Sequence, residues 1–393
     1  MSETNSLRGQ VAIVGAADTE VGKVPQLGAT ALCVEAARRA LDDAGITKDQ
    51  IDGLVTCNSM AEPHMYHAEA IAEYLQIFPR YCVTANAGGG TTFSVLQNAA
   101  SAIATGVCET VLISMADSLR SGLSREQAMM LQSSTGHPQF EVPYGATVPA
   151  YYALIARAYM DEYGATPEQL AAVAVNARSH AARNESAQMR EMISVDDVLS
   201  SGMIADPLHL LDCSLISDGG AAVILTSADR AADFPHDPVY VLGAGEGHGH
   251  EHISQARSLT TSAAVESGQR AFEMAGLGPG DVDVAEIYDC FTPVVLIELE
   301  DLGFCDKGEA GAFVEAGETA LDGSLPMNTH GGLLSHCHPG NPGSMFALTE
   351  AVTQLRHGAG DRQVKNAEVA LVHAQGGIMS SHATLILGRE GSA

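Results

Sequence analysis

With 393 residues, 46% of them hydrophobic and 17% charged, the chain is long enough to form two ordinary domains or one large duplicated one. Its formal charge of −28 at pH 7 argues against binding to nucleic acid or to an anionic membrane surface, because both attract Lys and Arg. The eight cysteines form no CxxC pair, no apolar run could span a bilayer and the first residues carry no signal-peptide pattern, so we expect a cytoplasmic protein with free thiols.

The first elements alternate between strands and helices. A β-branched run at residues 10–16 predicts a buried strand, and residues 51–57 predict the next one. Between them, residues 27–44 have the Ala and Leu spacing of a helix that ends at Gly45, a typical C-terminal cap. This alternation is typical of an α/β protein with a largely parallel sheet.

A glycine-rich loop, NAGGGTT, follows at residues 86–92. A helix over residues 94–105 and a strand over residues 109–115 are predicted next. A strand, a glycine loop and a helix N-terminus in succession gather backbone N–H groups at one point, although a lone triple glycine usually marks only a turn.

The alternation of predicted strands and helices is interrupted over residues 118–205. This stretch contains a Met-rich segment, a helix over residues 149–163 and a second helix that opens with the capping box formed by Thr166 and Gln169. We interpret it as a mostly helical insertion that covers one end of the sheet as a substrate-binding lid. The pattern then returns to the sheet at residues 210–227.

The second half begins with a predicted strand at residues 239–243, which gives an N-terminal half at residues 1–234 and a C-terminal half at residues 235–393. The alternating His248, His250 and His252 invite a metal interpretation. They lie in one glycine tract with no distant ligand to complete a site, so we expect a solvated loop and no metal.

An internal repeat relates the two halves. The segment RALDDAGI at residues 39–46 is followed by Ile-Asp, and RAFEMAGL at residues 270–277 is followed by Val-Asp. Each copy predicts a helix, a glycine cap, a short loop and a strand, the later strand of the second half falling at residues 369–374. A duplicated α/β unit would bring two glycine loops and two helix N-termini to one pocket across a pseudo-twofold axis.

The second glycine loop, NTHGGLLSHCHPGNPGSM at residues 328–345, leads into a helical run at residues 346–355. It places His338 and Cys337 where backbone N–H groups can hold a carbonyl oxygen or an oxyanion. A tight turn with packed side chains is the simpler interpretation, but four glycines and two prolines around His338 favour a functional one.

Together these residues resemble the thiolase superfamily over nearly the whole chain, in particular its sterol-carrier-protein (lipid-transfer-protein) type. The resemblance rests on EIYDCFT at residues 286–292, LGFC at 302–305, Asn328 with Gly331, Gly332 and the His338-Pro339 pair, and SDGGAA at 217–222. It implies a duplicated five-layered α-β-α-β-α fold, a homodimer or larger assembly, acyl-CoA substrates, and no cofactor other than the coenzyme A of the substrate.

The family's nucleophilic cysteine lies three residues after an asparagine and 17 residues before a glycine that ends the following helix. Counted from Asn86 and from Gly106, both spacings lead to Gly89, so the nucleophile is missing. Cys82 lies on or beside the preceding strand and cannot replace it without a loop rearrangement. The family's C-terminal Cys-x-Gly motif is also absent, since HAQGG occupies residues 373–377.

Thiolysis needs a thiolate, whereas retro-aldol cleavage of a 3-hydroxyacyl-CoA needs a base, an oxyanion hole and a proton donor. We assign thioester and oxyanion stabilisation to His338 with the backbone at Gly89, Gly376 and Gly377. Tyr288 is the candidate base, which requires a lowered pKa or a proton relay to His338, and Cys290 is the candidate proton donor. Further pocket candidates are Asn328, Cys337 and His373.

The chain is similar to a cysteine-lacking branch of the superfamily that acts as an aldolase in steroid side-chain degradation. That branch typically pairs with a small subunit carrying an OB fold and a zinc ribbon. The Met-rich insertion and Tyr151-Tyr152 are compatible with a bulky apolar acyl group. Two alternatives stay open: an acetyl-CoA acyltransferase (thiolase), and a non-catalytic thiolase-like partner subunit.

Overall fold

The structure is a computed structural model that describes residues 7–389, so residues 1–6 and 390–393, at the outer ends of the two predicted halves, lie outside the described residues. The N-terminal half contains β1 (Val11–Asp18), α1 (Ala29–Ala44), β2 (Gly53–Cys57), α2 (His67–Leu75), β3 (Tyr81–Ala85), α3 (Thr91–Ala104), β4 (Thr110–Ser118), β7 (Asp218–Ser227) and α9 (Ala228–Ala231). The insertion before β7 contains α4 (Leu119–Gly122), α5 (Arg125–Ser133), α6 (Val148–Tyr163), α7 (Pro167–Ala181), α8 (Val195–Ser200), β5 (Met203–Ala205) and β6 (Leu208–His209). The C-terminal half contains β8 (Val239–His248), α10 (Ala264–Ala275), β9 (Val284–Ile287), α11 (Thr292–Asp301), α12 (Ala310–Glu315), α13 (Gly343–Leu355), β10 (Val369–Gly376) and β11 (Ser381–Arg389).

The main sheet has nine strands in the order β3-β2-β4-β7-β1-β8-β11-β10-β9. Strand β2 pairs in parallel with β3 and β4, and β9 pairs in parallel with β10. The remaining neighbours are antiparallel. The expectation of a largely parallel sheet was therefore wrong, because the last strand of each half, β7 or β11, runs antiparallel to both of its neighbours and the two halves join through the antiparallel pair of β1 and β8.

The predicted internal repeat is confirmed by the topology. The order β2-β4-β7-β1 in one half matches β9-β10-β11-β8 in the other, with the same parallel and antiparallel steps. A parallel bridge between Ala285 and Met327 takes the place that β3 has in the first half. The helices α1 and α10 both end at a left-handed glycine with φ 65°, Gly45 and Gly276, because a residue with no Cβ adopts this conformation without strain.

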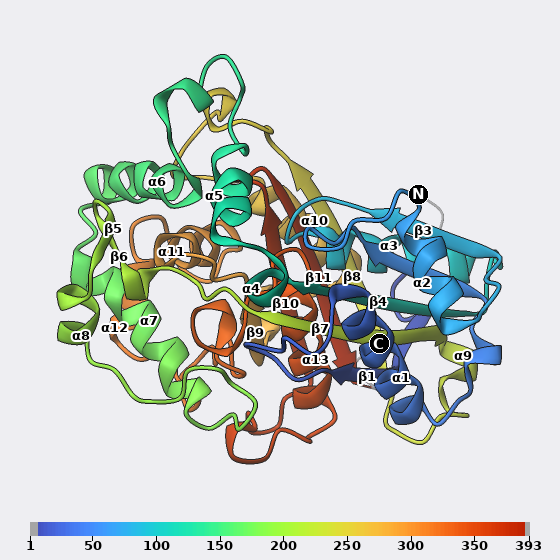
Figure 1. Ribbon diagram of the computed structural model, residues 1–393. Coiled ribbons are helices and arrows are strands. Elements are labelled where there is room, and N and C mark those ends of the chain that lie inside the picture. The colour runs from blue at the N-terminus through green and yellow to red at the C-terminus, as the bar shows by residue number, and fades with distance from the viewer. Residues whose placement is uncertain (1–6, 390–393) are drawn as a thin grey trace.

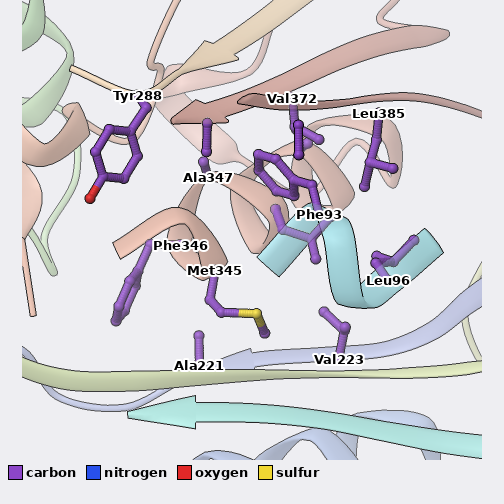
Figure 2. Close-up of a cluster of buried hydrophobic side chains, with 14 of the residues drawn as sticks. Phe93, Leu96, Ala221, Val223, Tyr288, Met345, Phe346, Ala347, Val372 and Leu385 are labelled. Atoms are coloured by element: carbon purple, nitrogen blue, oxygen red, sulfur yellow. The ribbon is translucent and has the colours of Figure 1, made fainter. Parts of the chain in front are cut away.

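Two helices lie between the two halves of the sheet. Helices α3 and α13 contact strands of both halves, whereas α1 contacts β1, β4 and β7 and α10 contacts β8 and β11. Every residue of α13 except Thr353 is buried, as expected for a helix covered on all sides. Figure 2 shows Phe93 and Leu96 from α3 and Met345 from α13 packed between Val223 of β7 and Leu385 of β11. These are the five layers that the resemblance implied.

The insertion forms a helical layer at one end of the molecule, opposite α1 and α2 (Figure 1). Helices α6 and α7 pack against α11, so the insertion covers the segment that follows β9. The capping box between Thr166 and Gln169 is present as predicted. Among the described residues, no helix is both long enough and apolar enough to cross a membrane.

Candidate active site

The two glycine loops meet, as the repeat predicted. The Asn341 side chain donates a hydrogen bond to Asn86 Oδ1 (3.2 Å), and the Ser344 hydroxyl donates to the Gly89 carbonyl oxygen (2.5 Å). One loop leads from β3 into α3 and the other leads into α13, so both central helices begin at the same place. These two hydrogen bonds hold Gly89 opposite the loop that carries His338.

Gly89 has no room for a side chain. A Cβ atom built on Gly89 would overlap the ring of Tyr288 and would lie 2.5 Å from the carbonyl oxygen of Gln375. A Cβ on Gly376 would overlap the Ala87 carbonyl in the same way. The glycines here allow the close approach of two backbones and of the phenol ring. Tyr288 thus fills the space into which a side chain at position 89 would project.

Tyr288, His338 and Ser214 form a chain of hydrogen bonds. The Tyr288 hydroxyl lies 2.9 Å from His338 Nε2, and the Ser214 hydroxyl lies 2.8 Å from His338 Nδ1. The rings of Tyr288 and His338 meet edge to face, with centroids 5.7 Å apart. In Figure 2 the Tyr288 hydroxyl points away from the apolar cluster at whose edge the ring lies.

Burial controls the charge of both aromatic groups. It lowers the pKa of His338 to about 4 and raises the pKa of Tyr288 well above its ordinary value, the latter with help from nearby acidic groups. At neutral pH the imidazole and the phenol are therefore both uncharged. The neutral imidazole keeps one nitrogen lone pair, which can accept the phenol proton.

The His338 backbone is tied to a neighbouring segment. Its N–H donates to Ser217 Oγ (3.0 Å), and its carbonyl oxygen accepts from the Ser217 N–H (3.1 Å). Just upstream, residues Gly332–His336 form a π-helical turn, a local irregularity that often marks functional sites. The Asp289 carboxylate accepts from the N–H groups of Leu333 (2.6 Å) and Leu334 (3.3 Å) in that turn.

Cys290 belongs to a second group of hydrogen bonds, with Gln375 and Tyr152. Its sulfur accepts a hydrogen bond from Gln375 Nε2 (3.1 Å), which also lies 2.6 Å from the Tyr152 hydroxyl. Tyr152 in turn donates to the Gly377 carbonyl oxygen (3.0 Å). Burial and the nearby Glu298 raise the pKa of the Cys290 thiol, so this group stays protonated at neutral pH. A protonated thiol can donate a proton but is a poor nucleophile.

A cleft of about 420 Å³ connects these groups. The predicted residues Gly89, Tyr288, Cys290, His338, Gly376 and Gly377 all line it. Its walls are mainly apolar and come in part from the predicted lid, through Leu123, Leu131, Val148, Tyr152 and Ile204.

Three further pocket candidates do not line this cleft. The Asn328 side chain is used to pair with the Ile287 backbone, at 2.7 and 2.8 Å. Cys337 is buried beneath the His338 loop. His373 lies two residues further from the end of β10 than Gln375, so it is buried beneath α11 and does not reach the cleft. Its Nδ1 lies 2.8 Å from the Thr384 hydroxyl oxygen.

Comparison with known proteins decides the family. Residues 11–229 match the thiolase N-terminal domain and residues 245–389 match the thiolase C-terminal domain-like family. The chain belongs to the thiolase superfamily. This confirms the resemblance drawn from the YDCF, SDGG and His338 motifs.

Several relatives align with almost the whole length of this protein. A steroid side-chain-cleaving aldolase of Thermomonospora curvata is 38% identical over 98% of this chain and 99% of its own, and a 17-hydroxy-3-oxo-4-pregnene-20-carboxyl-CoA lyase of Mycobacterium tuberculosis is 37% identical over 97% and 100%. An acetyl-CoA acetyltransferase of Methanothermobacter thermautotrophicus is 35% identical over 96% and 99%. A solved structure of an Ltp2-ChsH2(DUF35) aldolase superposes with a TM-score of 0.88 at 35% identity, over 98% of this chain and 99% of the other.

None of the eight cysteines of this superfamily member is activated as a thiolase nucleophile would be. Burial raises the pKa of every one of them: Cys33, Cys57, Cys82, Cys108, Cys213, Cys290, Cys305 and Cys337. Cys82 lies on β3, outside the cleft, as its place in the sequence suggested. Cys290 and Cys213 do line the cleft, but as neutral thiols.

Sequence reasoning missed Ser214, Gln375 and Asn341, and it named Tyr152 only as compatible with a bulky acyl group. All four residues line the cleft and hold its other groups in place. Ser214 and His338 are 124 positions apart, and Tyr152 and Gln375 are 223 apart. A single sequence carries no signal for contacts at such separations.

Proposed function

We propose that this protein catalyses the retro-aldol cleavage of a 3-hydroxyacyl-CoA thioester without a covalent acyl-enzyme. Its two relatives at 37% and 38% identity are an acyl-CoA lyase and a steroid side-chain-cleaving aldolase. The observation that carries the proposal is Tyr288, whose ring fills the space that a nucleophile at position 89 would need. A site without that nucleophile retains the parts that an aldol cleavage requires.

The first step removes the proton of the substrate's 3-hydroxyl group. Tyr288 is too basic as a phenolate to be ionised at neutral pH, because burial raises its pKa. A proton relay avoids the free-energy cost of forming a phenolate. Tyr288 accepts the hydroxyl proton while its own proton passes to His338 Nε2, 2.9 Å away. Ser214 holds the other imidazole nitrogen, so it orients the ring for that transfer.

The second step breaks the bond between the α- and β-carbons. The β-carbon leaves as a ketone or aldehyde, and the electron pair becomes the enolate of the shortened thioester. The backbone at Gly89, Gly376 and Gly377 supplies the enolate oxygen with N–H donors, each worth about 3–4 kcal/mol in comparable oxyanion holes. The Cys290 thiol protonates the α-carbon, and the proton held by His338 restores the thiol before the next turnover.

The acyl group of the substrate is bulky and apolar. The cleft of about 420 Å³ is lined by aliphatic side chains that include Leu119, Leu210 and Ile216. Such a lining favours a fused-ring or similarly large hydrocarbon over a short linear chain, because burial of apolar area drives binding. Coenzyme A takes part only as a portion of the substrate.

A small partner subunit completes the site. Apolar side chains at the cleft mouth remain exposed, among them Leu131 (40%), Ile204 (47%), Leu210 (55%) and Ile216 (50%). Exposed apolar patches of this kind are usually covered by a partner. The net charge of −28 leaves few cations for the phosphates of coenzyme A, which fits a partner that supplies them. The related Ltp2-ChsH2(DUF35) aldolase is such a two-protein complex by its name.

A substrate comparison tests the proposal. Matched 3-hydroxyacyl-CoA and 3-oxoacyl-CoA esters are supplied with and without free coenzyme A, and with and without any co-purifying partner. We expect cleavage of the hydroxy ester in the absence of free coenzyme A, with release of a ketone or aldehyde. An acyl adduct on a cysteine, seen by intact-protein mass, would refute the proposal.

The acyltransferase is the second candidate because one relative at 35% identity is an acetyl-CoA acetyltransferase. It predicts cleavage of the 3-oxo ester only when free coenzyme A is present. It also requires a thiolate, and both thiols that line the cleft have raised pKa values. Failure to cleave either ester in any combination would favour a non-catalytic subunit.

A further inference from the structure

A second cluster of chemically active side chains lies beneath the cleft, among α11, β10 and β11. Glu298, His373 and His382 are all fully or almost fully buried, and each offers one ligand atom within 4.8 Å of the others. His373 Nε2 lies 3.2 Å from His382 Nδ1, and Glu298 Oε1 lies 3.5 and 3.8 Å from these two nitrogens. None of the three lines the cleft.

The hydrogen bonds leave this cluster incomplete. His373 Nδ1 is paired with Thr384 Oγ1 at 2.8 Å, so its Nε2 faces the cluster, where it lies 3.2 Å from His382 Nδ1. Neither carboxylate oxygen of Glu298, which is 0% exposed, has a hydrogen-bond partner among the described residues. A buried carboxylate without partners is costly, because nothing replaces the hydration that it loses.

We propose that Glu298, His373 and His382 bind one zinc ion. Two imidazoles and one carboxylate are ligands that zinc uses. Burial raises the pKa of Glu298 well above its usual range, so zinc would displace the proton of this group, and the resulting carboxylate would compensate the charge of the ion. Zinc bonds of 2.0–2.1 Å separate tetrahedral ligands by about 3.3–3.4 Å, close to the three separations here. Burial lowers the pKa of both histidines, to about 3 for His382, so both are in the neutral form that binds metal.

Other occupants fit less well. Magnesium and calcium prefer oxygen ligands, and octahedral iron would bring the three ligand atoms to about 3.0 Å from one another. Without a metal ion, the His382 Nδ1–H group would donate a hydrogen bond to His373 Nε2 and occupy the lone pair of that nitrogen. The Glu298 carboxyl group, 3.5 and 3.8 Å from the two nitrogens, would then still have no hydrogen-bond partner.

The second sphere of the site is already in place. Thr384 orients His373 through Nδ1, the arrangement that usually fixes the tautomer of a metal-binding histidine. A cavity of about 250 Å³ is lined by Ile297, the residue before Glu298, and by Met379, His248 and His250, and the three proposed ligands do not line it. Two of the loop histidines that first suggested a metal, His248 and His250, line this cavity and are not among the three proposed ligands.

The ion would stabilise the arrangement of α11 and β10 beneath the active site without contacting the substrate. Glu298 lies on the helix that begins after Cys290 and Phe291, and the His373 carbonyl accepts a hydrogen bond from the Tyr288 N–H (3.0 Å). Strand β10 continues from His373 to Gln375 and Gly376 at the cleft. The proposal does not depend on the proposed reaction, since binding is measured without substrate.

Metal analysis of the untagged full-length protein tests the site. We expect one zinc per chain after gel filtration, a higher melting temperature with zinc than after dialysis against a chelator, and a tetrahedral visible spectrum when cobalt(II) replaces zinc. Glu298→Gln keeps the side-chain shape and should lose stoichiometric zinc. Thr384→Val should weaken zinc binding about 10–100-fold, as removal of a second-sphere partner typically does.

A control separates this site from the exposed histidines. The triple variant His248→Ala, His250→Ala, His252→Ala should retain one tightly bound zinc. Loss of zinc from the triple variant but not from Glu298→Gln would overturn the proposal, as would wild-type protein that binds no zinc. Should Glu298→Gln fail to fold, X-ray absorption of wild-type protein decides, since only two nitrogen ligands and one carboxylate oxygen from the chain agree with the proposal.

Discussion

Tyr288 and His338 carry the proton relay, so removal of the phenol hydroxyl alone tests it. Tyr288→Phe keeps the ring beside Gly89 and removes only the oxygen that lies 2.9 Å from His338 Nε2. We expect kcat on the 3-hydroxyacyl-CoA to fall about 10²–10⁴-fold, the usual contribution of a positioned acid–base group, with KM changed far less. Tyr144→Phe, at a side chain that is 86% exposed and does not line the cleft, is the matched control. An unchanged kcat in Tyr288→Phe would exclude the relay.

Gly89→Cys tests whether the missing thiol alone separates this site from a thiolase. The new Cβ would overlap the Tyr288 ring, so the side chains must shift apart. We expect lyase activity to fall at least tenfold and no acyl adduct to form, as followed by steady-state assay and intact mass. Adding Tyr288→His, which replaces the phenol by a smaller ring, makes room for the thiol. A stable acyl adduct in Gly89→Cys alone would show that Tyr288 does not block the position.

Burial of His338 also makes stability depend on pH. Its pKa falls from 6.5 to about 4 in the folded chain, so between these values the unfolded chain binds a proton that the folded chain does not. Stability is therefore lost as pH falls from 6.5 to 4, by about 3 kcal/mol for this one group. Asp18 and Asp289, whose pKa values are raised to about 7 and about 6, act in the opposite direction.

Comparison with His338→Gln isolates the histidine, because the aspartates contribute equally to both proteins. Between pH 7 and pH 4 the wild type should lose up to about 3 kcal/mol more unfolding free energy than the variant. Urea unfolding at the two pH values measures this difference. Equal losses in the two proteins would mean that His338 is not held neutral by burial.

At the scale of elements, the π-helical turn at Gly332–His336 depends on Asp289. The carboxylate accepts hydrogen bonds from Leu333 and Leu334, and a Cβ on Gly332 would overlap it. Asp289→Ala leaves two buried N–H groups without an acceptor, so we expect a loss of about 2–4 kcal/mol in unfolding free energy. Asp42→Ala, at an exposed side chain on α1, should change it by less than about 0.5 kcal/mol. Chemical denaturation of the two variants gives the comparison.

Local signals in the sequence predicted elements well. The helix that ends at Gly45, the capping box at Thr166 and the helix after the His338 loop are set by neighbouring residues and were found. Strand direction is different, because it depends on partners far along the chain. The antiparallel pairs of β7 and β11 and the extension of β8 to His248 were therefore missed.

The same distinction holds within the site. The spacing known for the thiolase family led to Gly89, and the family's motifs led to Tyr288, Cys290 and His338, all of which line the cleft. His373 was assigned to the cleft because it is close to Gly376 in sequence. Side chains two residues apart share one face of a strand, so His373 follows Gln375 on that face but lies one step deeper. Its partner Glu298 lies on another element, and no pattern in the sequence joined them.

At the scale of the whole molecule, one edge of the sheet is a candidate surface for a second copy of the chain. Strand β3 ends the nine-stranded order, and three aromatic side chains near it are exposed: Tyr66 (68%), Tyr74 (65%) and Phe78 (99%). An uncovered edge strand with apolar neighbours is prone to pair with another chain. Since a twofold axis brings the same strand from each copy together, we propose a homodimer that forms through this edge.

Phe78→Glu tests the homodimer. Two charges would face each other across the twofold axis in a surface that is otherwise apolar, so we expect the variant to be a monomer at concentrations at which the wild type is a dimer. Light scattering after gel filtration measures the mass. Phe140→Glu, at a lid side chain 64% exposed and distant in sequence from β3, should leave the dimer intact. A dimer that survives Phe78→Glu but dissociates in Phe140→Glu would move the interface from the sheet edge to the lid, where the partner subunit is proposed to bind.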